Sequence, residues 1–244
     1  MGLDGWRVMD ATVRYIGSEH FTIADAKRGD IGNTAEQYAR AFFEQMPFHS
    51  ITVAPYMGED SVKPFLKTEG KWAIVLGLTS NAGAADFELQ KLAGTDRFLY
   101  EEVMEKTAGW GSPNNLMFVV GATQAAQFAN IRKITPEHFY LVPGVGAQGG
   151  SLRDISQIAM IKDAGLLVNA SRAIQYASSG PDFLLKKQPK WREITRPKCR
   201  RICPPQEGES LNFGRLFNVL LILKFDTNGS PHGPVYQPGL FSVR

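Results

Sequence analysis

The sequence predicts a parallel α/β protein. Short apolar segments of four to seven residues recur along the chain, and stretches with helical apolar spacing separate them. Strands that are covered by helices on both faces need no polar alternation, and these segments show none. Polar residues gather directly after the apolar segments, at the expected carboxyl ends of the strands. Active sites of parallel α/β proteins lie at those ends.

The first half of the chain is expected to start with a helix, because Trp6, Met9, Val13 and Ile16 are spaced to share one helical face. Apolar strands and helical stretches then alternate. The expected elements are a strand at 20–25, a helix at 31–46, a strand at 50–54, a helix at 61–67, a strand at 72–78, helices at 86–92 and 96–107, and a strand at 116–120.

The second half continues this alternation and brings the expected total to six strands. Its expected elements are a helix at 123–132, a strand at 139–142, a helix at 152–163 and a strand at 166–169. The strand at 139–142 runs into the glycine-rich loop 143–150, and the last strand runs into Ala170-Ser171-Arg172. Both junctions place polar or flexible residues at the carboxyl end of a strand.

Length and composition fit a substantial core in one large domain or two small ones. No apolar run is long enough to cross a bilayer, and residues 1–20 lack a basic start followed by an apolar segment, so we expect a cytoplasmic protein. Cys199 and Cys203 form no disulfide framework and, without a nearby histidine, make a poor zinc site. The histidines are scattered singly, and we interpret them as surface or structural residues.

The net charge of +3 is unevenly distributed. Residues 183–244 hold eleven Lys and Arg against four Asp and Glu, a net +7, which leaves −4 for residues 1–182. We therefore expect a boundary near Gly180-Pro181. The basic residues and Trp191 could form a nucleic-acid-binding arm, but seven prolines favour a solvated, poorly ordered tail. Residues 217–225 are too short to span a membrane and could form a strand or an aggregation-prone segment.

The chemistry of the chain concentrates in residues 25–34, Asp-Ala-Lys-Arg-Gly-Asp-Ile-Gly-Asn-Thr. The preceding strand delivers Asp25 at its carboxyl end, and alternation along a strand points Asp25 and Lys27 the same way. Asp30 lies beyond the strand, before the next helix. Two ionisable groups are costly to bury unless they are paired, which favours a site. An ordinary surface ion pair explains the spacing equally well.

The loop Gly144-Val145-Gly146-Ala147-Gln148-Gly149 fits the pattern G-x-G-x-x-G between a strand and a helix. A dinucleotide site would need an acidic residue at the end of the next strand, which instead ends in Asn169. A barrel binds phosphate with its last two βα loops, through backbone N–H groups and a helix N-terminus. Arg172 would add a bidentate charge there, so the pattern favours phosphate.

Taken together, these residues resemble the orotidine 5′-phosphate decarboxylase family, in its longer bacterial branch. The matching segments, in chain order, are Asp25-x-Lys27-x-x-Asp30-Ile31-Gly32-Asn33-Thr34, Ile51-Thr52-Val53-x-Pro55-Tyr56-x-Gly58, Thr79-Ser80-Asn81, the run from Val142 to Gly150, and Asn169-x-Ser171-Arg172. The resemblance covers residues 1–182. It implies a (β/α)8 TIM barrel that dimerises across the carboxyl-end face of its strands and uses no cofactor and no metal.

The resemblance implies decarboxylation of orotidine 5′-monophosphate to UMP in de novo pyrimidine biosynthesis. Lys27 would stabilise the negative charge that develops at C6 of the pyrimidine and would protonate that carbon. Asp25 would hold Lys27 charged and crowd the departing carboxylate. A preorganised array of this kind in a dry pocket is electrostatic catalysis. No nucleic acid and no membrane is implied as a partner.

The same resemblance assigns the substrate-binding residues. Asp30, with Ile31 and Thr34, would reach into the site of the partner subunit of a homodimer. Ser80 would contact the pyrimidine ring. The set is completed at the phosphate end by Gln148, Gly149, Ser171 and Arg172.

The chain departs from the family at both ends. The family's barrel has two strands before the Asp25 strand, bearing a ribose-binding Asp and a network Lys, whereas residues 1–19 here suffice for one helix. We therefore expect an incomplete barrel of about six strands with an exposed edge or a gap. Residues 183–244 lack the closing helix of the family. We hypothesise a truncated gene model at the start and an altered reading frame at the end, which resequencing the locus would test.

Two alternatives stay open. A related barrel that decarboxylates or condenses a sugar phosphate also carries Asp-x-Lys-x-x-Asp, together with a metal, although the continuation through Thr34 and the glycine loop argue against it. The other alternative is a catalytically inactive or unstable remnant.

Overall fold

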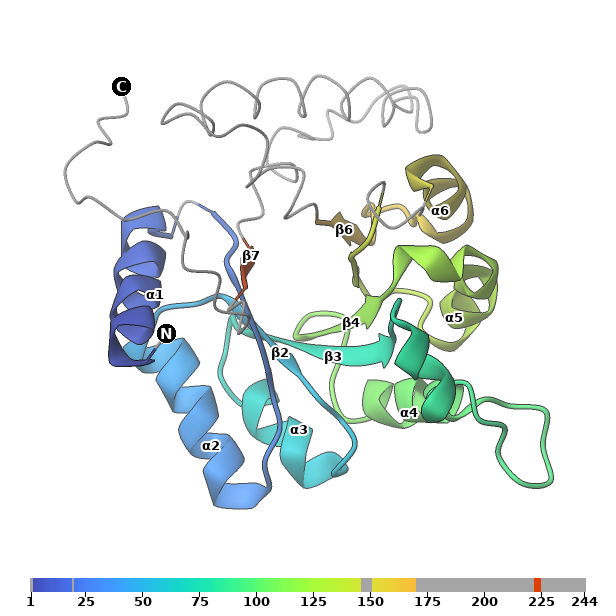
Figure 1. Cartoon of the computed structure of the whole chain (residues 1–244), viewed down its shortest axis with the longest axis horizontal. Helices are drawn as coiled ribbons and strands as arrows, with labels where there is room; N and C mark the ends of the chain where they lie inside the picture. Colours follow the sequence, from blue (N-terminus) through green and yellow to red (C-terminus); the bar gives the residue numbers. More distant parts are fainter. Residues whose placement is uncertain (1, 19, 146–150, 170–221, 225–244) are drawn as a thin grey trace.

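The computed structural model describes residues 2–18, 20–145, 151–169 and 222–224. Its centre is a sheet of seven strands in the order β6-β5-β4-β3-β2-β1-β7, in which every neighbouring pair is parallel (Figure 1). The strands are β1 (Ile23–Arg28), β2 (Ser50–Val53), β3 (Trp72–Leu78), β4 (Leu116–Val120), β5 (Tyr140–Val142), β6 (Leu166–Val168) and β7 (Ile222–Lys224). The predicted incomplete barrel of six parallel strands is confirmed for β1 to β6.

Helices follow the strands in the alternation that the sequence predicts. They are α1 (Gly2–Ile16), α2 (Gly32–Arg40), which continues into a π-helical turn (Ala41–Gln45), α3 (Glu59–Leu66), α4 (Leu99–Ala108), α5 (Phe128–Ile134) and α6 (Leu152–Ala159). Two 3₁₀ segments, Ala82–Asp86 and Ala122–Gln127, follow β3 and β4. The expected helix at 123–132 is therefore divided between a 3₁₀ segment, which is kinked at Gln124, and helix α5.

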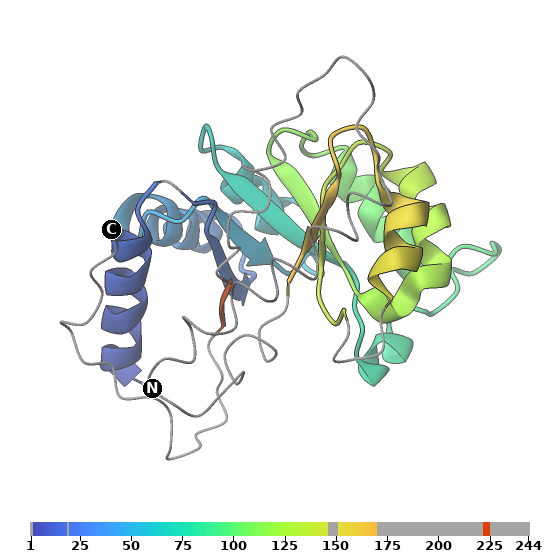
Figure 2. The same ribbon diagram turned by 90° about the horizontal axis from the view of Figure 1, so that it is seen from above.

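The two faces of the sheet carry different cores. Alternate residues of β3 show this: Ala73 and Val75 join the large cluster between the sheet and the helices, whereas Ile74 belongs to a smaller cluster on the opposite, inner face. The smaller cluster comprises Ile23, Ile74, Met117, Val119 and Leu141. Because side chains alternate along a strand, Asp25 follows Ile23 onto this inner face. The helices lie along the outer side of the curved sheet (Figure 2).

The edge of β1 that faces away from β2 pairs with β7, so the expected open edge falls at β7 among the described strands. β7 lies against β1, with Ile23 opposite Ile222 and Asp25 opposite Lys224. At the other end of the sheet, β6 has β5 as its strand neighbour among the described residues. The strand forms within the segment 217–225 that the sequence left open between a strand and an aggregation-prone stretch. The rest of the predicted tail lies outside the described residues.

The predicted helix at 86–92 is wrong. Residues 87–98 instead form turns closed by an antiparallel bridge between Lys91 and Phe98. The carboxylate of Glu88 lies at the end of β3, where it accepts hydrogen bonds from Thr79. A continuous helix over 86–92 would not place the Glu88 side chain at this position. This contact across nine positions of sequence is stronger than the local helical preference of the segment.

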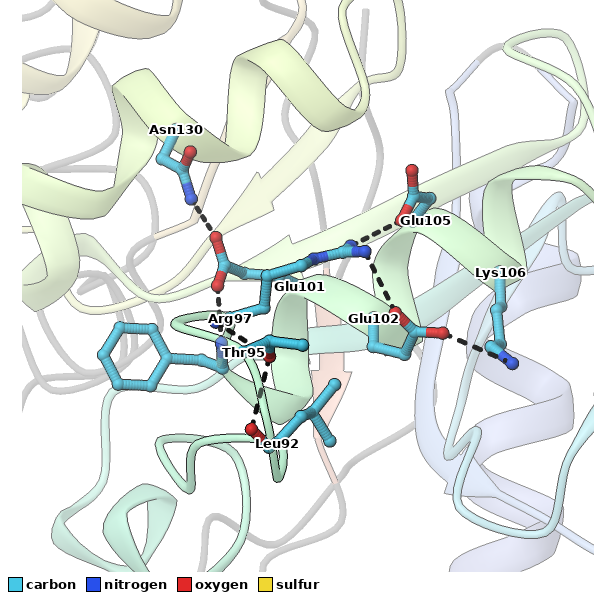
Figure 3. A network of polar contacts seen from close by, with 9 residues as sticks. Leu92, Thr95, Arg97, Glu101, Glu102, Glu105, Lys106 and Asn130 are labelled. Atoms are coloured by element: carbon cyan, nitrogen blue, oxygen red, sulfur yellow. Dashed lines mark hydrogen bonds and ion pairs between the residues drawn. The ribbon is translucent and has the colours of Figure 1, made fainter.

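Helix α4 begins at Leu99, three residues later than predicted. The carboxylate of Glu101 accepts the Phe98 backbone N–H at 2.6 Å and so satisfies a group at the helix start. The same carboxylate accepts a hydrogen bond from the Asn130 amide of α5 (Figure 3). On the exposed side, Arg97 bonds Glu105 at 2.5 Å and Glu102 at 3.1 Å. The network joins the loop to α4 and α5, which fixes the helix boundary.

Candidate functional site

Asp25 and Lys27 form an ion pair on the inner face of β1. The Nζ atom of Lys27 donates to Oδ1 of Asp25 at 2.5 Å. The Asp25 side chain is 6% exposed, whereas that of Lys27 is 50% exposed. The predicted common direction of the two side chains is confirmed. The strand itself continues to Arg28, so Asp25 lies within it rather than at its end.

The backbone at this pair is irregular. Ala24 is opposite Ile51 and Arg28 is opposite Val53, so four steps along β1 match two steps along β2. Lys27 takes up the difference with a φ of +45°, in the left-handed region that residues other than glycine seldom adopt. The strand therefore bulges where it presents its ammonium group.

Thr52 of β2 lies against this bulge and was not identified from the sequence. Its Oγ1 atom accepts the Lys27 backbone N–H at 2.8 Å and donates to Asp25 Oδ1 at 3.1 Å. The residue is fully buried. Apart from its place in the family-like segment that begins at Ile51, the signal in the sequence is a hydroxyl inside the apolar strand Ser-Ile-Thr-Val, and threonine is common in strands for reasons of packing alone.

Asp30, Ile31 and Thr34 lie together at the start of α2. The Asp30 carboxylate accepts the Ile31 backbone N–H at 2.8 Å, and Thr34 donates its backbone N–H to the Ile31 carbonyl at 3.1 Å. Ile31 is 56% exposed. Its side chain has no role in the core, so these residues face outward from the end of β1.

The loop that carries Ser80 is held by its neighbours at the carboxyl end of β3. Glu88 accepts the Thr79 backbone N–H at 2.6 Å and its hydroxyl at 2.8 Å. The Gln124 side chain donates to the Thr79 carbonyl at 3.3 Å. Gly121 passes so close that a Cβ there would lie 2.6 Å from the Ser80 Cβ. Ser80 is thus fixed from two directions and remains partly exposed.

The structure describes only the residues that flank the predicted phosphate-binding end of the site. Gly144 follows β5 with a φ of +90°, and Ser151 caps α6 by accepting the Asp154 backbone N–H at 3.3 Å. The predicted binding residues Gln148, Gly149, Ser171 and Arg172 lie outside the described residues. Asn169, directly after β6, is 8% exposed, and its Oδ1 has no hydrogen-bond partner among the described residues.

A second charged cluster lies at the opposite ends of the strands, before β5 and β6. Arg132 donates to the carbonyl groups of Thr135, Pro136, His138, Ala159 and Gly165 at 2.8 to 3.5 Å. Its guanidinium carbon lies 3.9 Å from the ring centroid of Tyr140. Burial, followed by the Arg132 charge, lowers the pKa of His138 to about 4. Carbonyl groups and an aromatic ring surround the Arg132 guanidinium group, so we interpret the cluster as structural.

Two other kinds of site are absent from the described residues. No three or more His, Cys, Asp and Glu side chains are grouped there so that they could hold a metal ion. None of the described helices has the length and apolar character needed to cross a membrane.

Comparisons with known proteins place these residues in a wider set. Residues 8–182 match the model of the orotidine 5′-phosphate decarboxylase / HUMPS family. Orotidine 5′-phosphate decarboxylases of Christiangramia forsetii and Flavobacterium johnsoniae are each 55% identical to the chain, over 186 and 188 residues. The matches cover 75% and 76% of this chain and 68% of each relative. The chain thus spans about two thirds of their length.

A solved structure gives the same result for the fold. The OMP decarboxylase of Leishmania donovani is 34% identical, with a TM-score of 0.70, and the match covers 81% of this chain and 76% of that one. The resemblance drawn from the sequence motifs is therefore confirmed by both comparisons.

Proposed function

The chain belongs to the orotidine 5′-phosphate decarboxylase / HUMPS family, and from that premise we propose how it converts orotidine 5′-monophosphate to UMP. The reaction is that of a carboxy-lyase in pyrimidine biosynthesis. The observation that supports the proposal best is the Asp25–Lys27 pair, because it lies within the matched residues and combines a buried carboxylate with a half-exposed ammonium group.

The chemistry requires one bond to break and one to form. The bond between C6 and the carboxylate carbon breaks, carbon dioxide leaves, and the electron pair remains on C6. The Lys27 ammonium would stabilise this charge and donate a proton to C6, which gives UMP. Asp25 would hold the ammonium in place, and its negative charge would disfavour the substrate carboxylate more than the departing neutral carbon dioxide.

Substrate binding would use the other carboxyl ends of the strands. Ser80 would contact the pyrimidine ring from the loop after β3, which Glu88 and Gly121 hold in place. The phosphate would bind to Gln148, Gly149, Ser171 and Arg172. Binding energy at the distant phosphate would help to force the substrate carboxylate toward Asp25.

A homodimer across the carboxyl-end face is also proposed. In support, apolar side chains are exposed after β1 and β2 and in the turns that follow β3: Ile31 is 56% exposed, Tyr56 85% and Phe87 64%. The rings of Tyr56 and Phe87 lie 6.4 Å apart between centroids. Exposed apolar groups that gather in this way mark interaction surfaces. Asp30, Ile31 and Thr34 would contribute to the partner's site.

We further propose that residues 1–182 form the catalytic unit and that 183–244 are a separate, poorly ordered segment. The family match ends at residue 182, where the charge also changes sign. A cytoplasmic location is proposed because phosphorylated nucleotides are multiply charged and cross bilayers poorly.

The assay follows the loss of ultraviolet absorbance when orotidine 5′-monophosphate is added. It compares the chain with a second protein in which the two strands that the family places before β1 are joined to its start. We expect turnover in the joined protein without added metal. Absence of turnover there would refute the assignment, and metal-dependent turnover of a keto-sugar phosphate would favour the related barrel enzymes.

A further inference from the structure

The geometry points to Thr52 as the positioning residue of the candidate site: we propose that its hydroxyl sets the separation of Asp25 and the Lys27 ammonium group. The proposal rests on the proposed function for its consequence in catalysis, but not for its structural part. A closed ring of contacts supports it. Lys27 N–H bonds Thr52 Oγ1, Thr52 Oγ1 bonds Asp25 Oδ1, and Asp25 Oδ1 accepts Lys27 Nζ.

The backbone of Lys27 needs such a contact. A left-handed conformation is unfavourable for a non-glycine residue, so surrounding interactions must hold it. In this bulge the Lys27 N–H meets a side-chain hydroxyl on β2 instead of a backbone carbonyl. The hydroxyl therefore supplies the acceptor that regular pairing would have supplied.

The far side of the bulge is held independently. The Arg28 carbonyl accepts the Ala54 backbone N–H at 2.8 Å. The Arg28 guanidinium lies over the rings of Trp6, Tyr38 and Phe42, at 5.7, 5.4 and 6.0 Å from their centroids. Arg28 is thus anchored on the helix side while Lys27 is directed to the inner face, and Thr52 decides how Lys27 is presented between them.

The hydroxyl has a second effect on the carboxylate. Asp25 is 6% exposed, and a carboxylate in the interior needs hydrogen-bond donors. Thr52 donates to the same oxygen, Oδ1, that accepts the ammonium group of Lys27. This fixes the direction of the carboxylate, and through it the position of the ammonium group.

The test compares Thr52→Val, which keeps the shape and loses the hydroxyl, with Thr52→Ser, which keeps the hydroxyl. Ser50→Ala is the matched control, because Ser50 is equally buried on the same strand and bonds the Thr22 carbonyl instead. Amide hydrogen exchange is measured residue by residue in each protein. We expect exchange at Lys27 to accelerate at least about tenfold in Thr52→Val and to stay within about threefold of wild type in Thr52→Ser and Ser50→Ala.

The second readout is turnover of orotidine 5′-monophosphate, measured with each substitution made in the joined protein and compared with the joined protein of wild-type sequence. We expect Thr52→Val to lower kcat by about 10- to 100-fold with KM within about threefold, since a displaced catalytic group costs rate more than binding. Thr52→Ser should restore kcat to within about threefold of wild type. If the hydroxyl of Thr52 contributed only to stability, the folded fraction of Thr52→Val would keep the kcat of wild type.

The outcomes separate the two proposals. Unchanged exchange at Lys27 in Thr52→Val, or equal acceleration in Thr52→Ser, overturns the role of the hydroxyl. Accelerated exchange together with no turnover by the wild-type chain or by the joined protein supports the positioning role and refutes the proposed function. If exchange accelerates at all amides of Thr52→Val, Thr52→Ala replaces it in the comparison with Thr52→Ser. Alanine puts no methyl group beside the carboxylate.

Discussion

Two cations at opposite ends of the sheet show how a site differs from a structural cluster. Arg132, before β5 and β6, donates to five carbonyl groups and lies on the Tyr140 ring. Lys27, near the end of β1, is half exposed and bonds one carboxylate among the described residues. The two terminal nitrogens of the arginine are used within the fold, and its buried Nε atom has no acceptor among the described residues. The lysine keeps donors that can serve a ligand.

The difference follows from the chemistry of the two side chains. A guanidinium group has five donors in a fixed plane and can join several chain segments at once. An ammonium group has three donors on a flexible stem, so a partly exposed lysine can turn toward a substrate. Burial of a charge is therefore a poor guide to function by itself, and the number of donors left unused is a better one.

The largest effect is expected from Lys27→Ala. In the joined protein, removal of the cation should lower kcat at least about 1000-fold, because the charge at C6 loses both its partner and its proton donor. Binding of UMP should remain measurable, since the phosphate contacts are elsewhere. Steady-state kinetics and calorimetric titration check this, with Lys63→Ala as a control at an exposed lysine paired to Glu59. Turnover equal to wild type would remove Lys27 from its role.

Arg132→Met should mainly affect stability. It removes a donor from five carbonyl groups, of which Thr135 and Gly165 keep a second donor from Tyr140, and we expect the free energy of unfolding to fall by about 3–5 kcal/mol. Arg40→Met is the control, because Arg40 makes one exposed ion pair with Glu44 and should change stability by less than about 1 kcal/mol. Urea unfolding measures both variants. Equal midpoints would show that the structural cluster contributes little.

His138 should give this end of the molecule a pH dependence. Burial and the Arg132 charge lower its pKa from 6.5 to about 4, so the unfolded chain binds the proton more readily than the folded chain. Its contribution to stability is complete above pH 6.5 and is lost as the pH falls toward 4, by up to about 3 kcal/mol.

Urea unfolding between pH 7 and pH 5 tests the histidine against His138→Phe. The variant replaces a ring that contacts Phe118, at 5.4 Å between centroids, and cannot titrate. The stability lost on acidification should be smaller in the variant than in wild type. Parallel losses in the two proteins would assign the pH dependence to other groups.

Glu88→Ala should have the smallest of these effects. Loss of the carboxylate frees Thr79 and loosens the loop that carries Ser80, so we expect UMP to bind about tenfold more weakly. Glu88→Gln can still accept a hydrogen bond and should stay within about threefold of wild type. Glu105→Ala, at an exposed pair with Arg97, is the control. If alanine and glutamine behave alike at position 88, the carboxylate does not hold the loop.

The local sequence predicted the bounds of the strands well, but it did not predict contacts between residues far apart in the chain. β3 and β4 begin and end at the predicted residues, because continuous apolar runs with clear ends define buried strands. The prediction of a helix at 86–92 was wrong because the conformation of this segment depends on a contact between Glu88 and Thr79. The pairing of β7 with β1 joins residues about two hundred positions apart, which no local pattern encodes.

The same division applies to the site. The spacing of Asp25 and Lys27 predicted a shared direction, and the ion pair confirms it. The bulge that directs Lys27 inward depends on a register shift between two strands, so the role of Thr52 could not be read from its identity. Arg132 was missed for the opposite reason, because an arginine in a helix is ordinarily a solvated residue.

The most direct test of where the molecule acts is a titration with UMP followed by amide NMR. The account predicts chemical-shift changes at the carboxyl ends of β1 and β3, at Lys27 and Ser80, and none at Arg132 or His138. Changes centred on Arg132 and His138, with Lys27 and Ser80 unaffected, would contradict it.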